Sequence, residues 1–191
     1  LISVFAGSRK SEIIVLMPIL IDFINLMNKK YNDMTYVFHS TNEYSELIQF
    51  FINKSSITNC EVVSDDKIKS HILQKSVFAV AKSGTVSLEI CNAQIPLIIL
   101  YKMNFINFMI VKSLVKTKYA NIINFAADEE VIPELLQSNC NSNNIFKVVD
   151  SFLDNPNKIK EQVEKVQTIL KEFKINKSSS ELASSSLNKF L

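Results

Sequence analysis

Short apolar runs of strand length alternate with longer segments of helical length over the first hundred residues. The runs are LISVF at 1–5, TYVFH at 35–39, CEVV at 60–63, VFAVA at 77–81 and PLIIL at 96–100. Strands separated by helices predict βαβ crossovers and therefore a parallel sheet. Because the runs are apolar at nearly every position, helices should cover both faces of that sheet. We therefore expect an α/β fold, a Rossmann-like doubly wound parallel sheet.

The segments between the runs have apolar residues three and four positions apart, as amphipathic helices do. We expect these residues to form the buried faces of the first three helices: Ile14, Met17, Ile21 and Ile24; Leu47, Phe50 and Phe51; and Ile68 with Ile72.

Beyond residue 101 the pattern is mostly helical. We expect helices at 104–116, 131–137, 141–156 and 157–174, a sixth strand near 120–123, and a short last helix at 181–190 after the hinge-like NKSSS at 176–180. This organisation predicts one Rossmann-like domain at 1–175, followed by a hinge and C-terminal helix at 176–191. The first residue already belongs to a strand pattern, so we expect the N-terminal part of the protein to lie elsewhere.

Composition excludes several classes of protein. The net charge of +2 is too small to indicate a nucleic-acid partner. The three cysteines, Cys60, Cys91 and Cys140, are far apart and odd in number, which favours reduced thiols in the cytoplasm. The longest apolar run, Ile13 to Ile21, is far shorter than the ~20 residues that span a bilayer. No metal site and no cofactor are predicted.

Only two glycines occur in the 191 residues, and they occupy equivalent places. Gly7 lies in AGSRKSE, between the first run and the first helix; Gly84 lies in AKSGTVSLE, after the fourth run. In a sheet of order 3-2-1-4-5-6, strands 1 and 4 are neighbours at the point where the order reverses, and ligands bind outside the carboxyl ends of the strands there. Both glycine loops should therefore face one crevice.

The side chains around these glycines suit an anionic ligand. A glycine before a helix lets backbone amides approach a phosphate, and Ser83 and Thr85 add hydroxyl donors. Arg9, the only arginine among 21 basic residues, has a planar fork that matches two phosphate oxygens. Glu89 would accept hydrogen bonds from a ribose diol.

Each of these residues also has a plain structural interpretation. Glycine at a strand–helix turn is often only a turn residue, and serine there is often a cap. Arg9 would also reach Glu12 one helical turn away. The coincidence of two such loops favours the ligand-binding interpretation over the structural one.

Four stretches together resemble the lipid-A-disaccharide synthase family: AGSRKSE, KSGTVSLE, IPLIILYKM and LVKTKYANIINFAADEEVIPELLQ. The resemblance runs in order from Ile2 to about Gln137 and covers only the C-terminal half of a family member. It implies the GT-B glycosyltransferase architecture, in which two Rossmann-like halves face each other across a cleft. The C-terminal half of such an enzyme holds the nucleotide-sugar donor.

The resemblance also implies site residues. Its Gly-Ser-Arg motif falls on Gly7, Ser8 and Arg9, and its second motif on Ser83, Gly84, Thr85 and Glu89. Three further donor-binding positions fall on Asn124, Glu134 and Gln137. The chain departs from the family at Ile123, where proline is usual, and at Asp128-Glu129, where Gly-Arg is usual; we therefore leave the acidic pair out of the site.

The implied reaction is an inverting hexosyl transfer. A UDP-2,3-diacylglucosamine donor gives its sugar to the lipid acceptor 2,3-diacylglucosamine 1-phosphate, and UDP leaves. Arg9 would be the catalytic residue, stabilising charge on the departing diphosphate. No general base is evident. His39 ends the second run, away from the switch point, so we expect a structural role for it, and His71 should face solvent or pack. The base is expected from the N-terminal half, without which this chain should be inactive.

The segment YKMNFINFMIVKSLVKTK, at 101–118, permits two interpretations. A helix that is apolar on all sides is usually buried. The lysines after its apolar part also suit a helix at a membrane surface. The resemblance, to enzymes that act on lipids, implies a cytoplasmic protein that is peripheral at the inner membrane face.

Two other functions stay open. One is another UDP-sugar enzyme of the same fold, such as a UDP-N-acetylglucosamine 2-epimerase or the peptidoglycan glycosyltransferase, although PELLQ after KTKYANIIN argues against both. The other is a non-catalytic nucleotide-binding module.

Overall fold

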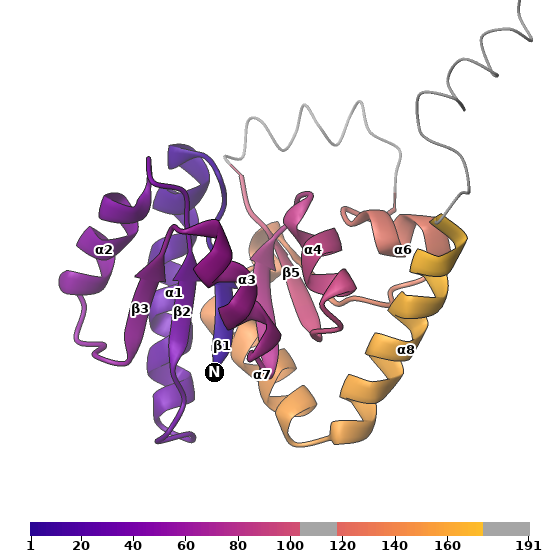
Figure 1. Cartoon of the computed structure of the whole chain (residues 1–191). Helices are drawn as coiled ribbons and strands as arrows, with labels where there is room; N and C mark the ends of the chain where they lie inside the picture. The colour runs from indigo at the N-terminus through magenta and orange to yellow at the C-terminus, as the bar shows by residue number, and fades with distance from the viewer. Residues whose placement is uncertain (104–117, 174–191) are drawn as a thin grey trace, which may run out of the picture.

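The computed structural model describes residues 1–103 and 118–173, which form a six-stranded sheet with helices on both faces (Figure 1). Every strand pairs in parallel with its neighbours. The strands are β1 (Ile2–Phe5), β2 (Tyr36–His39), β3 (Cys60–Val63), β4 (Phe78–Lys82), β5 (Leu97–Tyr101) and β6 (Glu134–Leu136).

The strand order is β3-β2-β1-β4-β5-β6. The order therefore reverses between β1 and β4, which are paired along Ile2 to Phe5 and Phe78 to Ala81. This confirms the expected doubly wound topology and puts the Gly7 and Gly84 loops at one edge of the sheet.

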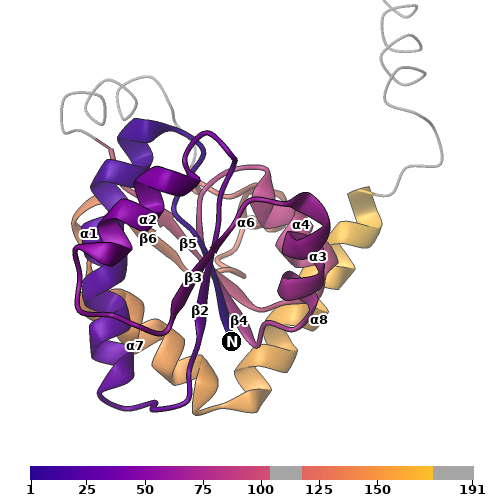
Figure 2. The ribbon, with the colours of Figure 1, turned by 60° about the vertical axis from the view of Figure 1, so that its left-hand side comes forward.

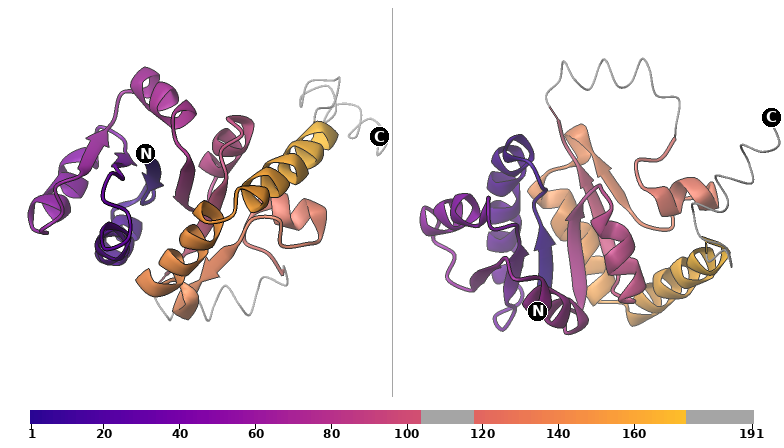
Figure 3. Two further views of the ribbon diagram at one scale, coloured as in Figure 1. Left: turned by 90° about the horizontal axis from the view of Figure 1, so that it is seen from below. Right: turned by 45° about the horizontal axis from the view of Figure 1, so that its top comes forward.

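The helices are α1 (Lys10–Asn28), α2 (Ser45–Asn53), α3 (Asp66–Gln74), α4 (Val86–Asn92), α6 (Ile122–Ala127), α7 (Ser142–Leu153) and α8 (Pro156–Phe173), with a 3-10 turn η1 (Gln137–Asn139). The helices α1, α2 and α7 cover one face of the sheet, and α3, α4, α6 and α8 cover the other (Figure 2). Seen from below, α8 runs beside α4 and α6 (Figure 3). The sheet is therefore the middle of three layers.

Two apolar clusters hold the layers together, one on each face of the sheet. The first joins α1 and α7 to inward side chains such as Val4, Phe38 and Phe78. The second joins α4, α6 and α8 to side chains such as Ala81 and Ile99. By length and composition alone α1 could cross a membrane, but seven of its side chains are buried in the first cluster, so it is a core helix of this fold.

Three expected details are wrong. Residues 120–123 do not form a strand, because Asn121 caps α6 by accepting from the Ile123 amide (2.8 Å). The stretch expected as a helix at 131–137 instead contains β6. In the first helices, Ile14, Phe50 and Ile68 are exposed, since the buried faces centre on neighbouring residues such as Ile13 and Ile48. The segments expected at 104–116 and 176–190 lie outside the described residues.

Candidate functional site

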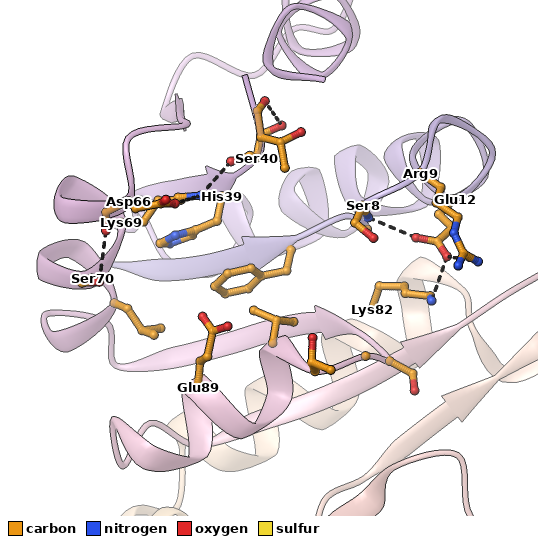
Figure 4. Close-up of a pocket in the computed structure, with 18 residues that line it drawn as sticks. Ser8, Arg9, Glu12, His39, Ser40, Asp66, Lys69, Ser70, Lys82 and Glu89 are labelled. Carbon is orange, nitrogen blue, oxygen red and sulfur yellow. Dashed lines mark hydrogen bonds and ion pairs between the residues drawn. The ribbon is translucent and has the colours of Figure 1, made fainter. Parts of the chain in front are cut away.

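A pocket of about 630 Å³ opens at the carboxyl end of the sheet, between the loops that follow β1 and β4 (Figure 4). Its volume falls within the usual range of small-molecule sites. Seven of the ten expected site residues line it: Gly7, Ser8, Arg9, Ser83, Gly84, Thr85 and Glu89. The two glycine loops do face one crevice.

Gly7 is required by the folded chain itself. Its φ is +115°, which side-chain-bearing residues rarely adopt, and a Cβ there would lie 2.6 Å from Glu12 Oε2. This close approach lets the Ser8 amide donate to Glu12 Oε2 (3.1 Å). The Gly7 loop is therefore closed over the carboxylate of Glu12.

Lys82, rather than Arg9, is the main partner of Glu12. The distance from Lys82 Nζ to Glu12 Oε1 is 2.8 Å, whereas Arg9 Nη1 lies 3.9 Å away and the Arg9 side chain is 80% exposed. The guanidinium is thus only loosely held at the rim of the pocket, where it stays accessible to a ligand. The sequence indicates Glu12 only as a partner of Arg9, and Lys82 is not among the expected site residues; the signal for it is a lysine two residues before Gly84.

Gly84 differs from Gly7, because no atom of the described residues requires the absence of its side chain. A Cβ would be 4.0 Å from its nearest neighbour, the Lys82 carbonyl, and φ is not positive. Neighbours hold the loop in place: the Ser83 hydroxyl donates to the Ala120 carbonyl (2.9 Å), and the Ser87 hydroxyl to the Gly84 carbonyl (2.7 Å). Within the described residues the Gly84 and Thr85 amides have no hydrogen-bond acceptor, so both are available to an anion.

Glu89 is the carboxylate of the pocket that has no cationic partner among the described residues, whereas Glu12 pairs with Lys82 and Asp66 with Lys69. Glu89 lies one turn into α4, is exposed, and makes no hydrogen bond or ion pair with any described residue. In Figure 4 its carboxylate faces His39 rather than the Arg9 and Lys82 end of the pocket. A ligand diol there would meet both of its oxygens.

Asn124, Glu134 and Gln137 do not line this pocket. Asn124 is fully buried: its side chain donates to the Ile132 carbonyl (2.6 Å) and accepts from the Val131 and Ile132 amides. Glu134 accepts from the Ala120 amide (2.7 Å), the Asn121 amide (2.9 Å) and Asn124 Nδ2 (2.8 Å). Asn124 holds the segment between α6 and β6, and Glu134 holds the residues just before α6. Those residues include the Ala120 carbonyl to which Ser83 is bound.

Gln137 follows β6 in the left-handed region, with a φ of +49°. Its Nε2 is buried and has no acceptor among the described residues.

His39 lines the pocket as well, contrary to the expectation that it lies away from the switch point. It is only 5% exposed, bonds Ser3 Oγ (2.7 Å) and stacks on Phe5 at a centroid distance of 4.3 Å. Burial, together with the charge of Lys69, lowers the pKa of His39 to about 4. His71 is exposed on α3 and outside the pocket.

Residues 1–103 and 118–173 contain neither a candidate metal site nor a cysteine with a lowered pKa. No group of three or more His, Cys, Asp or Glu side chains in those ranges could hold a metal ion. The three cysteines are free, and burial raises the pKa of the thiols of Cys60 and Cys91 to about 12 and of Cys140 to about 11. The thiols are therefore neutral packing groups.

Comparison with known proteins decides the family. The family model described as lipid-A-disaccharide synthetase matches residues 1–189. This chain belongs to the lipid-A-disaccharide synthase family. The lipid-A-disaccharide synthase of Rickettsia prowazekii is 36% identical over 186 residues, which are 96% of this chain and 48% of that protein. The chain thus spans about half the length of the curated relatives it matches, and it corresponds to their C-terminal half.

Solved structures share the fold at low sequence identity. The C-terminal domain of a group 1 glycosyl transferase from Francisella tularensis superposes with a TM-score of 0.60 at 13% identity, over 90% of this chain and 84% of that one. The UDP co-structure of MnaA from Staphylococcus aureus gives a TM-score of 0.61 at 14% identity, over 86% of this chain and 40% of that one. This member of the lipid-A-disaccharide synthase family therefore has the fold of one half of a GT-B protein.

Proposed function

We propose that this chain is the donor-binding half of a lipid-A-disaccharide synthase. The whole enzyme would transfer 2,3-diacylglucosamine from UDP-2,3-diacylglucosamine to 2,3-diacylglucosamine 1-phosphate and release UDP. The observation that carries the proposal is the convergence of the Gly7 and Gly84 loops, with Arg9, Lys82 and Glu89, on one pocket at the switch point of the sheet. Family membership favours this function over a 2-epimerase or a non-catalytic module.

The pocket offers a nucleoside diphosphate three kinds of contact. The free Gly84 and Thr85 amides and the Thr85 hydroxyl would bind one phosphate. Arg9 and Lys82 would balance the diphosphate charge, with Lys82 already directed by Glu12. Glu89 would accept from the ribose diol, since its carboxylate has no other partner among the described residues.

The chemical role of these groups is electrostatic. When the bond between the anomeric carbon and the diphosphate breaks, negative charge grows on the leaving oxygen. Donors fixed around that oxygen lower the barrier, and the loss of one such donor typically costs about 2.7–4 kcal/mol. Arg9 is the residue we assign to this task, because its guanidinium is exposed at the rim and only loosely paired.

A general base is missing from the pocket. His39 is kept neutral by burial but bonds Ser3 deep in the sheet, and Glu89 faces the ribose position. We propose that the base and the acceptor-binding wall come from the N-terminal half, and that the two halves enclose the sugar in an inverting transfer. Direct contacts of Asn124, Glu134 and Gln137 with the donor remain predictions.

A peripheral position at the inner membrane face is part of the proposal. Ile122 and Phe125 on α6 are 51% and 59% exposed, and they follow closely after the apolar segment at 104–116. Exposed apolar side chains next to lysines suit the interface of a bilayer. The segment itself lies outside the described residues.

Titration calorimetry with UDP tests the proposal. We expect the chain to bind UDP and Glu89→Ala to weaken binding about tenfold, as the loss of a charge-assisted contact predicts. Glu61→Gln, on an exposed β3 carboxylate outside the pocket, is the matched control and should bind like the wild type. A wild-type chain that is folded but does not bind UDP would contradict the donor site, and equal affinity in Glu89→Ala would remove only the ribose contact.

A further inference from the structure

One end of the pocket has no role in the contacts described so far. Its lining there consists of His39, Ser40, Lys69, Ser70 and Leu73, which come from the end of β2, the residue after it and α3. Figure 4 places His39, Lys69 and Ser70 at the opposite end of the pocket from Arg9 and Lys82, with Glu89 facing His39. If the phosphates lie at the glycine loops and the ribose at Glu89, the base extends into this end.

The hydrogen bonds of His39 determine which of its nitrogens carries the proton. Ser76 Oγ donates to the Ile72 carbonyl (3.1 Å), so it accepts from Ser3 Oγ (2.7 Å). Ser3, having used its proton, then accepts from His39 Nε2 (2.7 Å). This direction makes three hydrogen bonds, whereas the opposite one makes two and leaves the Ile72 carbonyl with the Lys75 amide as its partner.

His39 Nδ1 is therefore a hydrogen-bond acceptor. Nδ1 makes no hydrogen bond with a described residue, and it is not buried. Because His39 lines the pocket, the lone pair of Nδ1 is open to a ligand there. The ring cannot turn freely, since it is stacked on Phe5 with an interplanar angle of 18° and is 5% exposed. The pocket thus has a fixed acceptor at this end.

Lys69 supplies a fixed donor beside it. Its Nζ is 2.6 Å from Asp66 Oδ1 and donates to the Ser40 carbonyl (3.1 Å), which uses two of the three ammonium protons. The side chain is 22% exposed and lines the same end of the pocket. The third proton is available to a ligand.

We propose that His39 and Lys69 select uracil over cytosine in the nucleotide of the donor. Nδ1 of His39 accepts from N3–H of uracil, and Lys69 Nζ donates to its O4. Cytosine presents a lone pair at N3 and an amino group at C4. It would therefore place an acceptor against Nδ1 of His39 and a donor against Nζ of Lys69. Buried polar groups left unpaired by the wrong ligand are a strong source of discrimination. The assignment rests on the proposed function, because it needs the nucleotide to lie in this pocket.

Two variants of His39 separate base recognition from a structural role. In His39→Asn the amide oxygen takes the place of Nδ1, and the bond to Ser3 is lost. In His39→Gln the amide nitrogen takes the place of Nε2 and still reaches Ser3, but no acceptor faces the base. UDP and CDP are titrated calorimetrically into the full 191-residue chain and both variants, with circular dichroism to confirm folding.

We expect the wild type to prefer UDP over CDP by about tenfold or more. His39→Asn should keep most of that preference, and His39→Gln should lose it through weaker UDP binding. Lys69→Met should likewise weaken UDP and spare CDP, and it tests the assignment should a His39 variant fail to fold. An equal preference in wild type and His39→Gln, or none in the wild type, would overturn the assignment while leaving UDP binding intact. A folded wild type that binds neither nucleotide would overturn the proposed function as well.

Discussion

The two glycines of this chain are present for different physical reasons. Gly7 has a positive φ and packs against Glu12, so alanine there would strain the backbone and collide with the carboxylate. Gly84 has an ordinary φ and room for a Cβ. No described residue requires glycine at 84, and in our proposal the missing side chain makes room for a phosphate.

Alanine at each position should separate these reasons. Gly7→Ala is expected to lower the free energy of unfolding by about 1–3 kcal/mol, the usual cost of a strained backbone. Gly84→Ala should stay within about 1 kcal/mol of the wild type, but should weaken UDP binding about tenfold by crowding the phosphate. Urea denaturation and calorimetry measure the two quantities. Loss of stability in Gly84→Ala with unchanged UDP affinity would show that the loop serves the fold.

At the scale of elements, the start of α6 depends on one carboxylate. Glu134 accepts three hydrogen bonds, two of them from the buried or nearly buried Asn121 and Asn124. In Glu134→Gln the amide nitrogen would replace one accepting oxygen, so that at least the Ala120 amide would face another donor, at a cost of about 1 kcal/mol. Urea denaturation should show this loss, and Glu172→Gln, an exposed carboxylate on α8, should show almost none. Equal stability of the two variants would mean that water replaces the lost contacts.

The sequence predicts the large elements better than the small ones. Five strands follow from apolar runs bounded by polar segments, and their order is the one that a doubly wound sheet of this kind has. The helices expected at 141–156 and 157–174 are also present, as α7 and α8. The three residues of β6 are too few to show a period of two, and PELLQ suits a helix equally well by propensity. What makes β6 a strand is its pairing with β5 from Ile99 to Tyr101, a contact made across the fold.

The same distinction applies to the candidate site. Rare residues in strand–helix loops, such as Gly7, Arg9 and Gly84, are visible in a sequence and line the pocket. Lys82 and Lys69 are two of many lysines, and His39 is at the end of a strand that is not adjacent to the switch point. Their role depends on how far the pocket extends, which only the packing of α3 against the sheet determines.

For the whole molecule, burial of neutral His39 makes stability depend on pH. Its pKa is about 4 in the folded chain against about 6.5 when unfolded. The unfolded chain therefore binds the proton first as the pH falls, so the contribution is complete above pH 6.5 and is lost towards pH 4. The loss should reach about 3 kcal/mol, at 1.36 kcal/mol for each pKa unit.

Urea denaturation between pH 7 and pH 4 measures this contribution. Carboxylates also titrate in that range, so the quantity of interest is the difference between the wild type and His39→Gln. The variant should lose less stability on acidification. Parallel pH profiles would mean that His39 is protonated in the folded chain without penalty.

The proposed reaction also belongs to the scale of the whole enzyme. We expect this chain alone to form no disaccharide, because a donor site without the facing half cannot position the acceptor, and such positioning is worth about 7–11 kcal/mol. A general base contributes a further factor of about 10² to 10⁴. A radiolabelled lipid acceptor with the UDP-diacylglucosamine donor tests this.

The assay compares the chain alone with the chain mixed with a separately made N-terminal half from the same enzyme. Turnover that appears only in the mixture is the expected result. Disaccharide made by this chain alone would contradict the two-half mechanism and would call for a base among its own residues, with His39 and Glu134 the first to replace.

Among the residues that the structure describes, the eighteen that line the pocket fall between Phe5 and Glu89. The described part of the chain beyond Glu89 supplies β5, β6 and the helices that cover them, and reaches the pocket only through backing contacts such as the Ala120 carbonyl on Ser83. Ligand preference and mechanical support are thus encoded in separate stretches of one domain. Outside Asn124, Glu134 and Gln137, substitutions in the second stretch should therefore leave ligand preference unchanged as long as the core stays filled.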